Sequence, residues 1–311
     1  MTLQQLRYMI AIVRWGSFNM AAQKLFISQP SLSKSMNELE KEMGITLFAR
    51  TSRGAVLTEE GTRFLSYARQ VVEQADLLEH RYKAGEPVKR VFAVSSQHYA
   101  FVVNAFVALV KEYGKEKYEF TLRESRTWDI IEDLRLGRSE LGVLFMDHFR
   151  KDVLTHLLRE EDMEFYPLFK APVHVFISRN HPLAAKEKVT LEDLIPYPRL
   201  TYEQGTHNSL YFSEEPLITE YSPKNIVVTD RATLFNLVIG LNGYTICSGI
   251  LSRDLNGSEI ISRPLESDEE MTLGAVFPKG QPLLGMTKRY MDHLKSYISH
   301  LEGVKVLFPE K

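Results

Sequence analysis

The feature that most constrains the fold is a series of three short amphipathic segments at the start of the chain. In each of them apolar residues repeat at helical intervals, within residues 3–13, 18–26 and 32–43. The first helix should end near Gly16, and Ser17 can cap the second. Ser28 can cap the third, with Pro30 in the first turn, where a missing N–H costs nothing. These signals predict a compact three-helix module.

The exposed face of the third helix carries short polar side chains and one lysine near its N-terminal end. Such side chains can bond to base edges in the major groove, while the helix dipole and the lysine favour phosphate. Residues 45–57 predict a short hairpin whose arginine-rich turn can lie over the minor groove or the backbone. The predicted DNA-binding residues are Gln29, Pro30, Ser31, Ser33, Lys34, Asn37, Arg50 and Arg53.

Charge is distributed unevenly along the chain. The net charge of the whole protein is −2, yet residues 1–57 hold seven basic residues against three glutamates, a net charge of +4, which leaves −6 for the remainder. A basic head on an acidic body suggests a phosphate-binding module on a larger carrier. Taken alone, each charged segment is equally compatible with an ordinary solvated surface.

Residues 58–87 predict one long helix that links head and body. It begins at Thr58 with acidic residues in its first turn and ends before the break formed by Gly85 and Pro87. Its apolar residues alternate at intervals of four and three, the spacing of a coiled-coil seam. The alternative is a helix packed on its own chain. The predicted dimerisation residues are Phe64, Ala68, Val71, Ala75 and Leu78.

From Arg90 onward, short β-rich runs alternate with helical patterns, which predicts an α/β architecture with a mainly parallel sheet. The predicted strands are 91–95, 118–123, 141–145, 173–177, 199–202, 226–229, 244–247, 260–264 and 272–277. The predicted helices are 99–113, 128–136, 232–241 and 283–301, with shorter ones near 191 and 210.

Polar residues follow two of these strands. Ligands of open α/β sheets bind beyond the carboxyl ends of the strands, where helix N-termini supply free N–H groups. The predicted effector-binding residues are Ser95, Ser96, Gln97 and His98 in one half of the body, and Thr201, Tyr202 and Glu203 in the other. Hydroxyls beside a helix N-terminus suit a small anion or a zwitterion, whereas Glu203 would favour an amine. Ordinary capping of strand ends remains the alternative.

Residues 1–62 resemble the winged helix-turn-helix of LysR-type transcription regulators almost position by position. The matching residues are Leu6-Arg7-Tyr8-Met9, Gly16-Ser17-Phe18, Ala21-Ala22, Leu25, Ser28 to Ser33, Leu39-Glu40, Gly44, Leu47-Phe48 and Leu57 to Gly61. One departure is Lys34, where the family more often has arginine, which is better suited to bidentate base contacts. The body is similar to the family's effector domain, at Ala93 to Ser96, Leu134 to Val143, His181 to Ala184, Leu191 to Leu194 and Val238 to Ile246.

This resemblance implies a multidomain protein: an all-α winged helix-turn-helix head (1–57), a long linker and dimerisation helix (58–87) and a two-lobed α/β effector-binding domain (88–311). The effector domain should have the fold of type 2 periplasmic binding proteins, with lobe I at about 90–163 and 266–311 and lobe II at 164–265. The implied function is sequence-specific regulation of transcription, controlled by a small molecule bound between the lobes. The expected partners are double-stranded promoter DNA, this effector, and further copies of the chain in a homodimer or homotetramer.

Other functions fit the sequence less well. A solute-binding protein would explain the body but not the head, and the opening residues lack the pattern of a signal peptide. No stretch approaches the roughly 20 apolar residues of a membrane helix, so a cytoplasmic location without membrane contact is expected. A redox sensor of the peroxide-responsive type would need two cysteines, and the chain has only Cys247. Nucleotide-binding, hydrolase and zinc-protease motifs are missing from the sequence, so no enzyme, cofactor or metal is expected.

Overall fold

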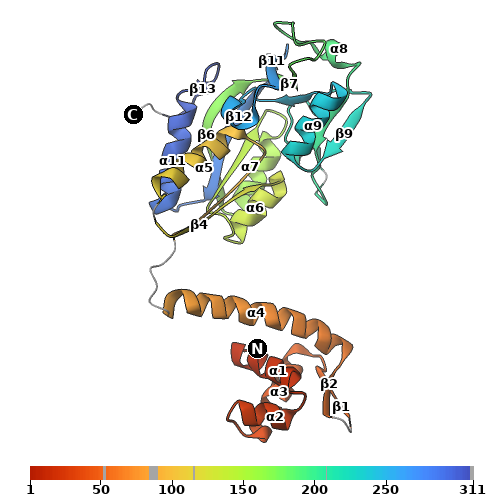
Figure 1. Ribbon diagram of the computed structural model, residues 1–311, viewed down its shortest axis with the longest axis vertical. Helices are drawn as coiled ribbons and strands as arrows, with labels where there is room; N and C mark the ends of the chain where they lie inside the picture. The colour runs from red at the N-terminus through yellow and green to blue at the C-terminus, as the bar shows by residue number, and fades with distance from the viewer. Residues whose placement is uncertain (52–53, 84–89, 115, 208, 309–311) are drawn as a thin grey trace. The chain divides into compact units, whose positions relative to one another are not determined.

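The computed structural model describes residues 1–51, 54–83, 90–114, 116–207 and 209–308 (Figure 1). The chain divides into two compact units, Met1–Val88 and Lys89–Lys311. The first holds the predicted head and linker helix, and the second holds the predicted effector domain. Among the described residues, no helix is long and apolar enough to cross a membrane.

The first unit follows the predicted order of elements: α1 (Leu3–Trp15), α2 (Phe18–Lys24), α3 (Gln29–Met43), the hairpin β1 (Phe48–Thr51) and β2 (Gly54–Leu57), and α4 (Glu59–Lys83). The predicted caps are confirmed. Ser17 Oγ accepts from the N–H of Met20, and Ser28 Oγ accepts from the N–H of Ser31. Gly16 adopts a left-handed conformation with φ of 73° and ends α1, a role that favours glycine.

One hydrophobic core holds this unit together. The buried stripe of α3, formed by Leu32, Met36 and Leu39, packs with Met9 and Ile12 of α1. The linker helix joins the same core through Leu65, and a Cβ at Gly61 would lie 2.1 Å from the carbonyl oxygen of Leu47. Only glycine allows α4 to start so close to the head, so the direction of this helix is fixed from its first turn.

The main sheet of the second unit has the strand order β13-β6-β12-β5-β3-β4. Strands β3 (Arg90–Ser96), β4 (Tyr118–Glu124) and β5 (Leu141–Met146) are parallel. The other neighbours, β12 (Glu270–Pro278), β6 (Met163–Pro172) and β13 (Lys305–Val306), pair antiparallel. The prediction of a mainly parallel sheet was therefore wrong: β12, which returns from the other lobe, runs opposite to β5 and β6.

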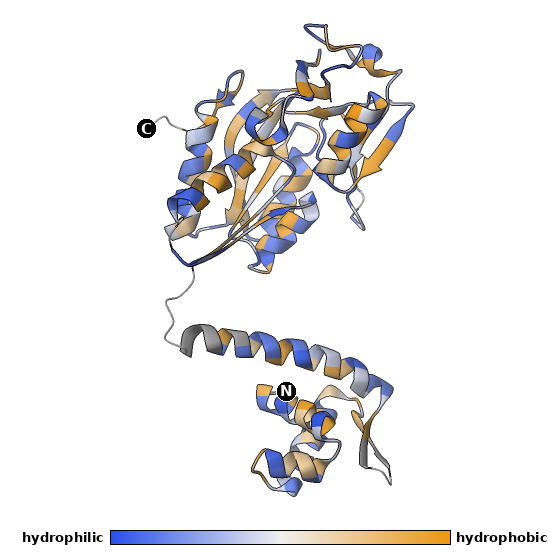
Figure 2. Cartoon of the chain, viewed as in Figure 1, coloured by the Kyte–Doolittle hydropathy of each residue, from blue (hydrophilic) through white to orange (hydrophobic). Residues whose placement is uncertain are grey.

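Helices cover both faces of this sheet: α5 (Ala100–Glu112) and α11 (Gly285–Ile298) on one, and α6 (Thr127–Arg135) and α7 (Lys151–Glu160) on the other. Successive residues of β5 point to opposite faces, so Phe145 packs with α5 while Leu144 packs with α6. Figure 2 shows the resulting concentration of apolar residues along the central strands. The carboxyl ends of β3 and β5 are thereby held on a rigid layer.

Lobe II has a smaller sheet with β7 (His174–Ser178) between β10 (Thr245–Cys247) and β11 (Ile260–Pro264), both antiparallel to it. Strands β8 (Arg199–Tyr202) and β9 (Asn225–Val228) form a separate parallel pair. The helices are α8 (Leu191–Leu194), α9 (Arg231–Leu241), α10 (Arg253–Asn256) and the 3-10 turn η1 (Leu210–Phe212). Most predicted elements of lobe II are thus confirmed.

The strand pairing corrects the predicted border between the lobes. The expected start of lobe II at residue 164 lies inside β6, and β6 pairs along its whole length with β12 of lobe I. The first crossover therefore lies between β6 and β7, and the second between β11 and β12. The sequence did not reveal α7 and β6, so this stretch was assigned to the wrong lobe.

Candidate DNA-binding surface and effector cleft

The structure gathers the predicted DNA-binding residues of α3 on one side of its N-terminal end. Gln29, Pro30, Ser31, Lys34 and Asn37 are exposed, and Ser33 is half-buried. Within this group Gln29 Nε2 donates to Ser33 Oγ at 2.8 Å. The apolar side of the helix faces the core, so the polar side is presented outward on a fixed support.

Lys34 is the cation of this surface. Its Nζ lies 4.0 Å from Glu38 Oε1, and both side chains are largely exposed. Such a pair on a helix surface is weak, so the ammonium is free to exchange Glu38 for a phosphate. The predicted contact at Arg53, and the side chain of Arg50, lie outside the described residues.

The predicted dimer seam on α4 divides into two parts. Ala68 is buried, and Phe64 is half-buried against the hydrophobic core of the head. Ala75 is half-buried, while Val71 and Leu78 are 44% and 59% exposed. The alternative reading, a helix packed on its own chain, therefore applies to the first half of the seam, and the second half leaves apolar side chains open.

The predicted effector residues at the end of β3 do not all face the cleft between the lobes. Ser95 Oγ donates to Asp133 Oδ2 at 2.5 Å and lies 2.8 Å from Ser139 Oγ, inside lobe I. Ser96 is fully buried and its hydroxyl donates to the backbone oxygen of Gln97. As effector ligands these two serines were wrong predictions, because both hydroxyls are used within lobe I.

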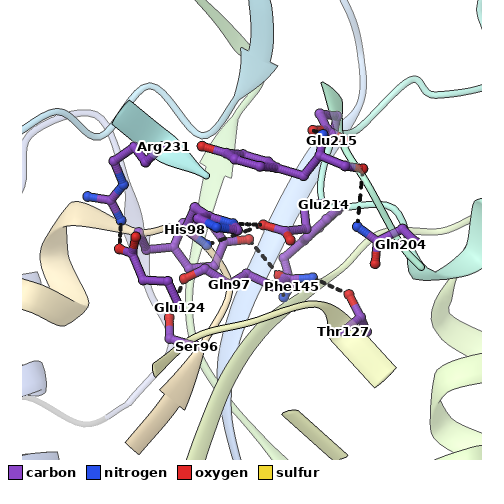
Figure 3. Close-up of polar contacts among 12 residues, drawn as sticks. Ser96, Gln97, His98, Glu124, Thr127, Phe145, Gln204, Glu214, Glu215 and Arg231 are labelled. Atoms are coloured by element: carbon purple, nitrogen blue, oxygen red, sulfur yellow. Dashed lines mark hydrogen bonds and ion pairs between the residues drawn. The ribbon is translucent and has the colours of Figure 1, made fainter. Parts of the chain in front are cut away.

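Gln97 is buried and organises the junction of the lobes. Its Nε2 donates to Thr127 Oγ1 at 2.6 Å, and its Oε1 accepts from the N–H of Phe145 and from Tyr99 Oη. Thr127 Oγ1 in turn donates to the backbone oxygen of Phe212 in lobe II at 2.7 Å. Gln97 therefore positions neighbouring groups and has little capacity left for a ligand (Figure 3).

His98 connects the two lobes directly. Its Nδ1 lies 2.7 Å from Glu214 Oε2, and its ring stacks on Tyr202 with 3.8 Å between the centroids and 4° between the planes. Burial favours the neutral imidazole, but the adjacent Glu214 carboxylate outweighs burial and raises the pKa of His98. Two of the predicted cleft residues, His98 and Tyr202, are thus in contact across the cleft.

Ion pairs reinforce this contact between the lobes. Glu203 Oε2 accepts from Arg126 at 2.6 Å, so this predicted effector residue already has a cationic partner. Arg231 of lobe II pairs with Glu124 of lobe I. Thr201 is buried at the end of β8, with no side-chain hydrogen bond among those of the described residues.

A buried arginine holds the loop of lobe II that lies over lobe I. Arg150 is 1% exposed, pairs with Asp147, and donates to the backbone oxygens of Ser213 and Glu215. Burial lowers the pKa of Arg150, although Asp147 opposes the shift. Arg150 of lobe I therefore holds the backbone of the segment that carries Glu214 and Glu215.

Comparison with known proteins gives the identity of both units. A family model for the bacterial regulatory helix-turn-helix protein of the lysR family matches residues 3–62, and a model for the LysR substrate binding domain matches residues 88–299. The chain belongs to the LysR family. It is a DNA-binding transcription regulator with an effector-binding domain, and its relatives are regulators rather than enzymes.

Individual relatives are similar over most of their length. The HTH-type transcriptional regulator YnfL of Escherichia coli is 28% identical over 94% of this chain and 97% of its own. The HTH-type transcriptional regulator AlsR of Bacillus subtilis is 28% identical over 78% of this chain and 77% of its own. Among solved structures, the LysR family regulator CbnR matches with a TM-score of 0.52 at 18% identity, over 96% of this chain and 99% of that one. The last match supports the fold alone.

The cleft of this LysR-family regulator contains a small cavity that sequence reasoning did not find. Its volume is about 50 Å³, and its walls come mostly from lobe II. The lining includes His98, Tyr99, Phe176, Tyr202, Glu214, Glu215, Arg231, Phe235, Cys247, Ser248 and Asn256. Glu214 and Glu215 were missed because they lie in an irregular segment rather than at a strand end. Two adjacent acidic residues between apolar Phe212 and Leu217 were the available signal.

The cysteine of the cavity is a poor candidate for redox chemistry. Burial raises the pKa of the Cys247 thiol to about 12, so the reactive thiolate is scarce near neutral pH. In the part of the chain that the structure describes, no group of three or more His, Cys, Asp or Glu side chains could hold a metal ion.

Proposed function

We propose that this LysR-type regulator binds promoter DNA as a homodimer, with the N-terminal end of α3 in the major groove, and that a small molecule bound between lobes I and II controls it. The observation that carries the DNA contact is the exposed polar side of α3 on a buried apolar stripe. Ser31 and Asn37 offer groups for base edges, while Lys34 offers a cation for phosphate. Because the target DNA lies in the bacterial cytoplasm, we place the protein there.

The test compares two lysines of the same helix. Lys34 lies near the DNA-facing end of α3, and Lys41 lies in its last turn, so Lys41→Ala is a matched control for Lys34→Ala. Binding to the DNA upstream of the protein's own gene is measured over a series of salt concentrations. Lys34→Ala should weaken binding and reduce the slope of log affinity against log salt by about 1, whereas Lys41→Ala should leave both unchanged. Equal behaviour of the two variants would contradict this placement of α3.

The exposed part of the α4 seam supports dimerisation. Val71 and Leu78 lie on the same side of α4, and two copies would remove both from water. A two-fold dimer reads a pseudo-palindromic site with two recognition helices, and pairing of dimers would give a tetramer. Sedimentation should show that Leu78→Glu shifts the protein toward monomer. Ser66→Glu, which adds the same charge on the opposite side of α4, should not, and a dimer unaffected by Leu78→Glu would exclude this seam.

The contacts across the cleft support control by an effector. His98 with Glu214, Arg126 with Glu203, and Glu124 with Arg231 would all have to lengthen or break if the lobes separated. An effector that binds one lobe arrangement more tightly shifts the population toward it. We propose that this shift alters how dimers pair, and with that the spacing of the heads on bent DNA. A solute-binding protein without a DNA-binding role would leave the head unexplained.

A further inference from the structure

We propose that the ligand of the cleft carries an organic ammonium group, which binds to Glu214 and Glu215. This inference rests on the proposed role of the cleft as the effector site and adds the chemical class of the effector. It is carried by the acceptor oxygens that line the cavity, by the aromatic side chains around them and by the balance of nearby charges.

Three buried oxygens on the cavity wall accept no hydrogen bond from any described residue: Glu214 Oε1, Glu215 Oε2 and Asn256 Oδ1. The exposed fractions of the two glutamates are 6% and 2%. Their second oxygens are used, since Glu214 Oε2 lies 2.7 Å from His98 Nδ1, and Glu215 Oε1 accepts from the N–H of Tyr202 at 2.7 Å. A buried carboxylate oxygen without a hydrogen-bond donor costs free energy. The cavity therefore favours a ligand that brings several hydrogen-bond donors.

The shape of the cavity fits the end of a small amine. Its volume of about 50 Å³ holds only a few non-hydrogen atoms. Phe176, Phe235 and Tyr202 line it together with the two carboxylates. The faces of aromatic rings attract ammonium groups through cation–π interactions. Three N–H donors of a primary ammonium would match the three unpartnered oxygens.

The nearby charges are unevenly shared: Glu214 pairs with His98, whereas Glu215 has no ion pair among the described residues. Arg231 is paired with Glu124, and Arg150 with Asp147. Arg199 is buried close by but donates to backbone oxygens of Pro216 and Leu217. Burial and the neighbouring Glu214 raise the pKa of Glu215 to about 7, which a bound cation would counteract. An anionic ligand would instead meet both acidic side chains, because the unpartnered buried atoms of the described lining residues are three acceptor oxygens and one donor, Arg231 Nε.

The experiment is calorimetric titration of the full-length protein with butylamine, putrescine, glycine, lysine and butyrate. We expect the amines to bind and butyrate not to bind, and the two amino acids show whether an added carboxylate is tolerated. Glu214→Gln and Glu215→Gln keep the shape of the side chain and should weaken amine binding at least tenfold. Glu187→Gln removes an exposed carboxylate of lobe II and should have no effect. Urea unfolding monitored by Trp128, which lies in the effector domain, confirms that this domain is folded in each variant.

Two results would overturn the inference in different ways. If butyrate binds and the amines do not, with binding still sensitive to Tyr202→Ala, the cleft remains the effector site and the ammonium class is wrong. If amines bind with equal affinity to wild type, Glu214→Gln and Glu215→Gln, they bind elsewhere, and the placement of the effector in the cleft loses its support as well.

Discussion

The DNA-binding head and the effector cleft are built over very different distances along the chain. The predicted base-reading side chains share one helix of 15 residues, and the cap that orients it joins Ser28 to Ser31. In the cleft, His98 and Glu214 are 116 residues apart, and Glu124 and Arg231 are 107 apart. Local rules therefore decide the recognition surface, whereas the cleft exists only after both lobes have folded and met.

Because the head is built locally and the cleft is not, substitutions in the two regions should differ in how far their effects extend. A change in the head should act on one compact unit with its own core, while a change in the cleft should act on lobes that are joined by several contacts at once. The two tryptophans allow the units to be followed separately, since Trp15 lies in α1 and Trp128 in α6. In the variant Trp128→Phe, the remaining Trp15 reports unfolding of the head alone. In Trp15→Phe, the remaining Trp128 reports unfolding of the body alone.

The largest effect is expected from a cavity in the head. Leu39 is fully buried in the core of the first unit, so Leu39→Ala should lower the free energy of unfolding of the head by about 2–5 kcal/mol. Urea unfolding monitored by Trp15 should move to lower urea, while the Trp128 transition stays in place. Leu294→Ala in α11 is the matched control in the body, and it should shift only the Trp128 transition to lower urea. A single shared transition that moves in both variants would show that the units are coupled in folding.

The second prediction concerns pH and the acidic pair. The pKa of Glu215 is about 7 in the folded protein against an ordinary value of 4.5. The folded state thus holds a proton that the unfolded state has released, and the body loses stability as pH rises from 4.5 through 7. A shift of this size corresponds to about 3 kcal/mol. Glu215→Gln should remove this loss, so its stability relative to wild type should increase between pH 5 and pH 8.

Urea unfolding of the body, monitored by Trp128 at both pH values, measures this change. His98 acts in the same direction in both proteins, because its raised pKa gives a stabilisation that is full below 6.5 and lost as pH rises through the folded-state value. The difference between variant and wild type therefore isolates Glu215. For Glu187→Gln, the difference in unfolding free energy from wild type should be the same at pH 5 and pH 8. If the difference for Glu215→Gln were also the same at both pH values, Glu215 would be ionised throughout this range.

The same contrast explains what the sequence could predict. The helices of the head were found with their caps because Ser17, Ser28 and Gly16 act within a few residues. The strands of the body were mostly found, yet their directions were not, because the pairing of β12 with β5 and β6 joins segments more than 90 residues apart. Parallel and antiparallel strands carry similar apolar patterns, so only the folded chain distinguishes them.

The cleft was predicted at the right strand ends but with some of the wrong side chains. Successive residues of a strand point to opposite faces, and the sequence does not reveal that Ser95 points toward Asp133 rather than toward lobe II. Of the predicted effector residues, His98 and Tyr202 line the cavity: His98 follows the end of β3, and Tyr202 is the last residue of β8. Glu214 and Glu215 reach the cavity from a segment without regular structure, where no periodic pattern applies.

The third prediction compares one helix cap in each unit. Ser28→Ala removes the cap of α3 and should lower the stability of the head by about 0.5–2 kcal/mol, with weaker DNA binding. Thr190→Ala removes the capping box of α8 and should act on the body transition alone. Unfolding monitored by each tryptophan measures both effects. If Ser28→Ala weakened DNA binding without any change in head stability, Ser28 would contact DNA itself.

The smallest effect is expected from the exposed ion pair across the cleft. Arg126 and Glu203 are 37% and 43% exposed, so a double-mutant cycle with alanine should give a coupling of about 0.2–1 kcal/mol that falls as salt is added. The pair of Arg63 with Glu59, four residues apart on α4, is the local counterpart in the first unit and should give about 0.3–0.5 kcal/mol. Similar values would mean that a contact between lobes contributes no more than a contact within one helix. The buried contacts of His98 and Arg150 would then hold the lobes together, because the charges of an exposed pair stay hydrated whether the lobes are in contact or separated. A coupling well above 1 kcal/mol would assign this pair a larger share in closing the cleft, and its loss should then weaken ligand binding as well.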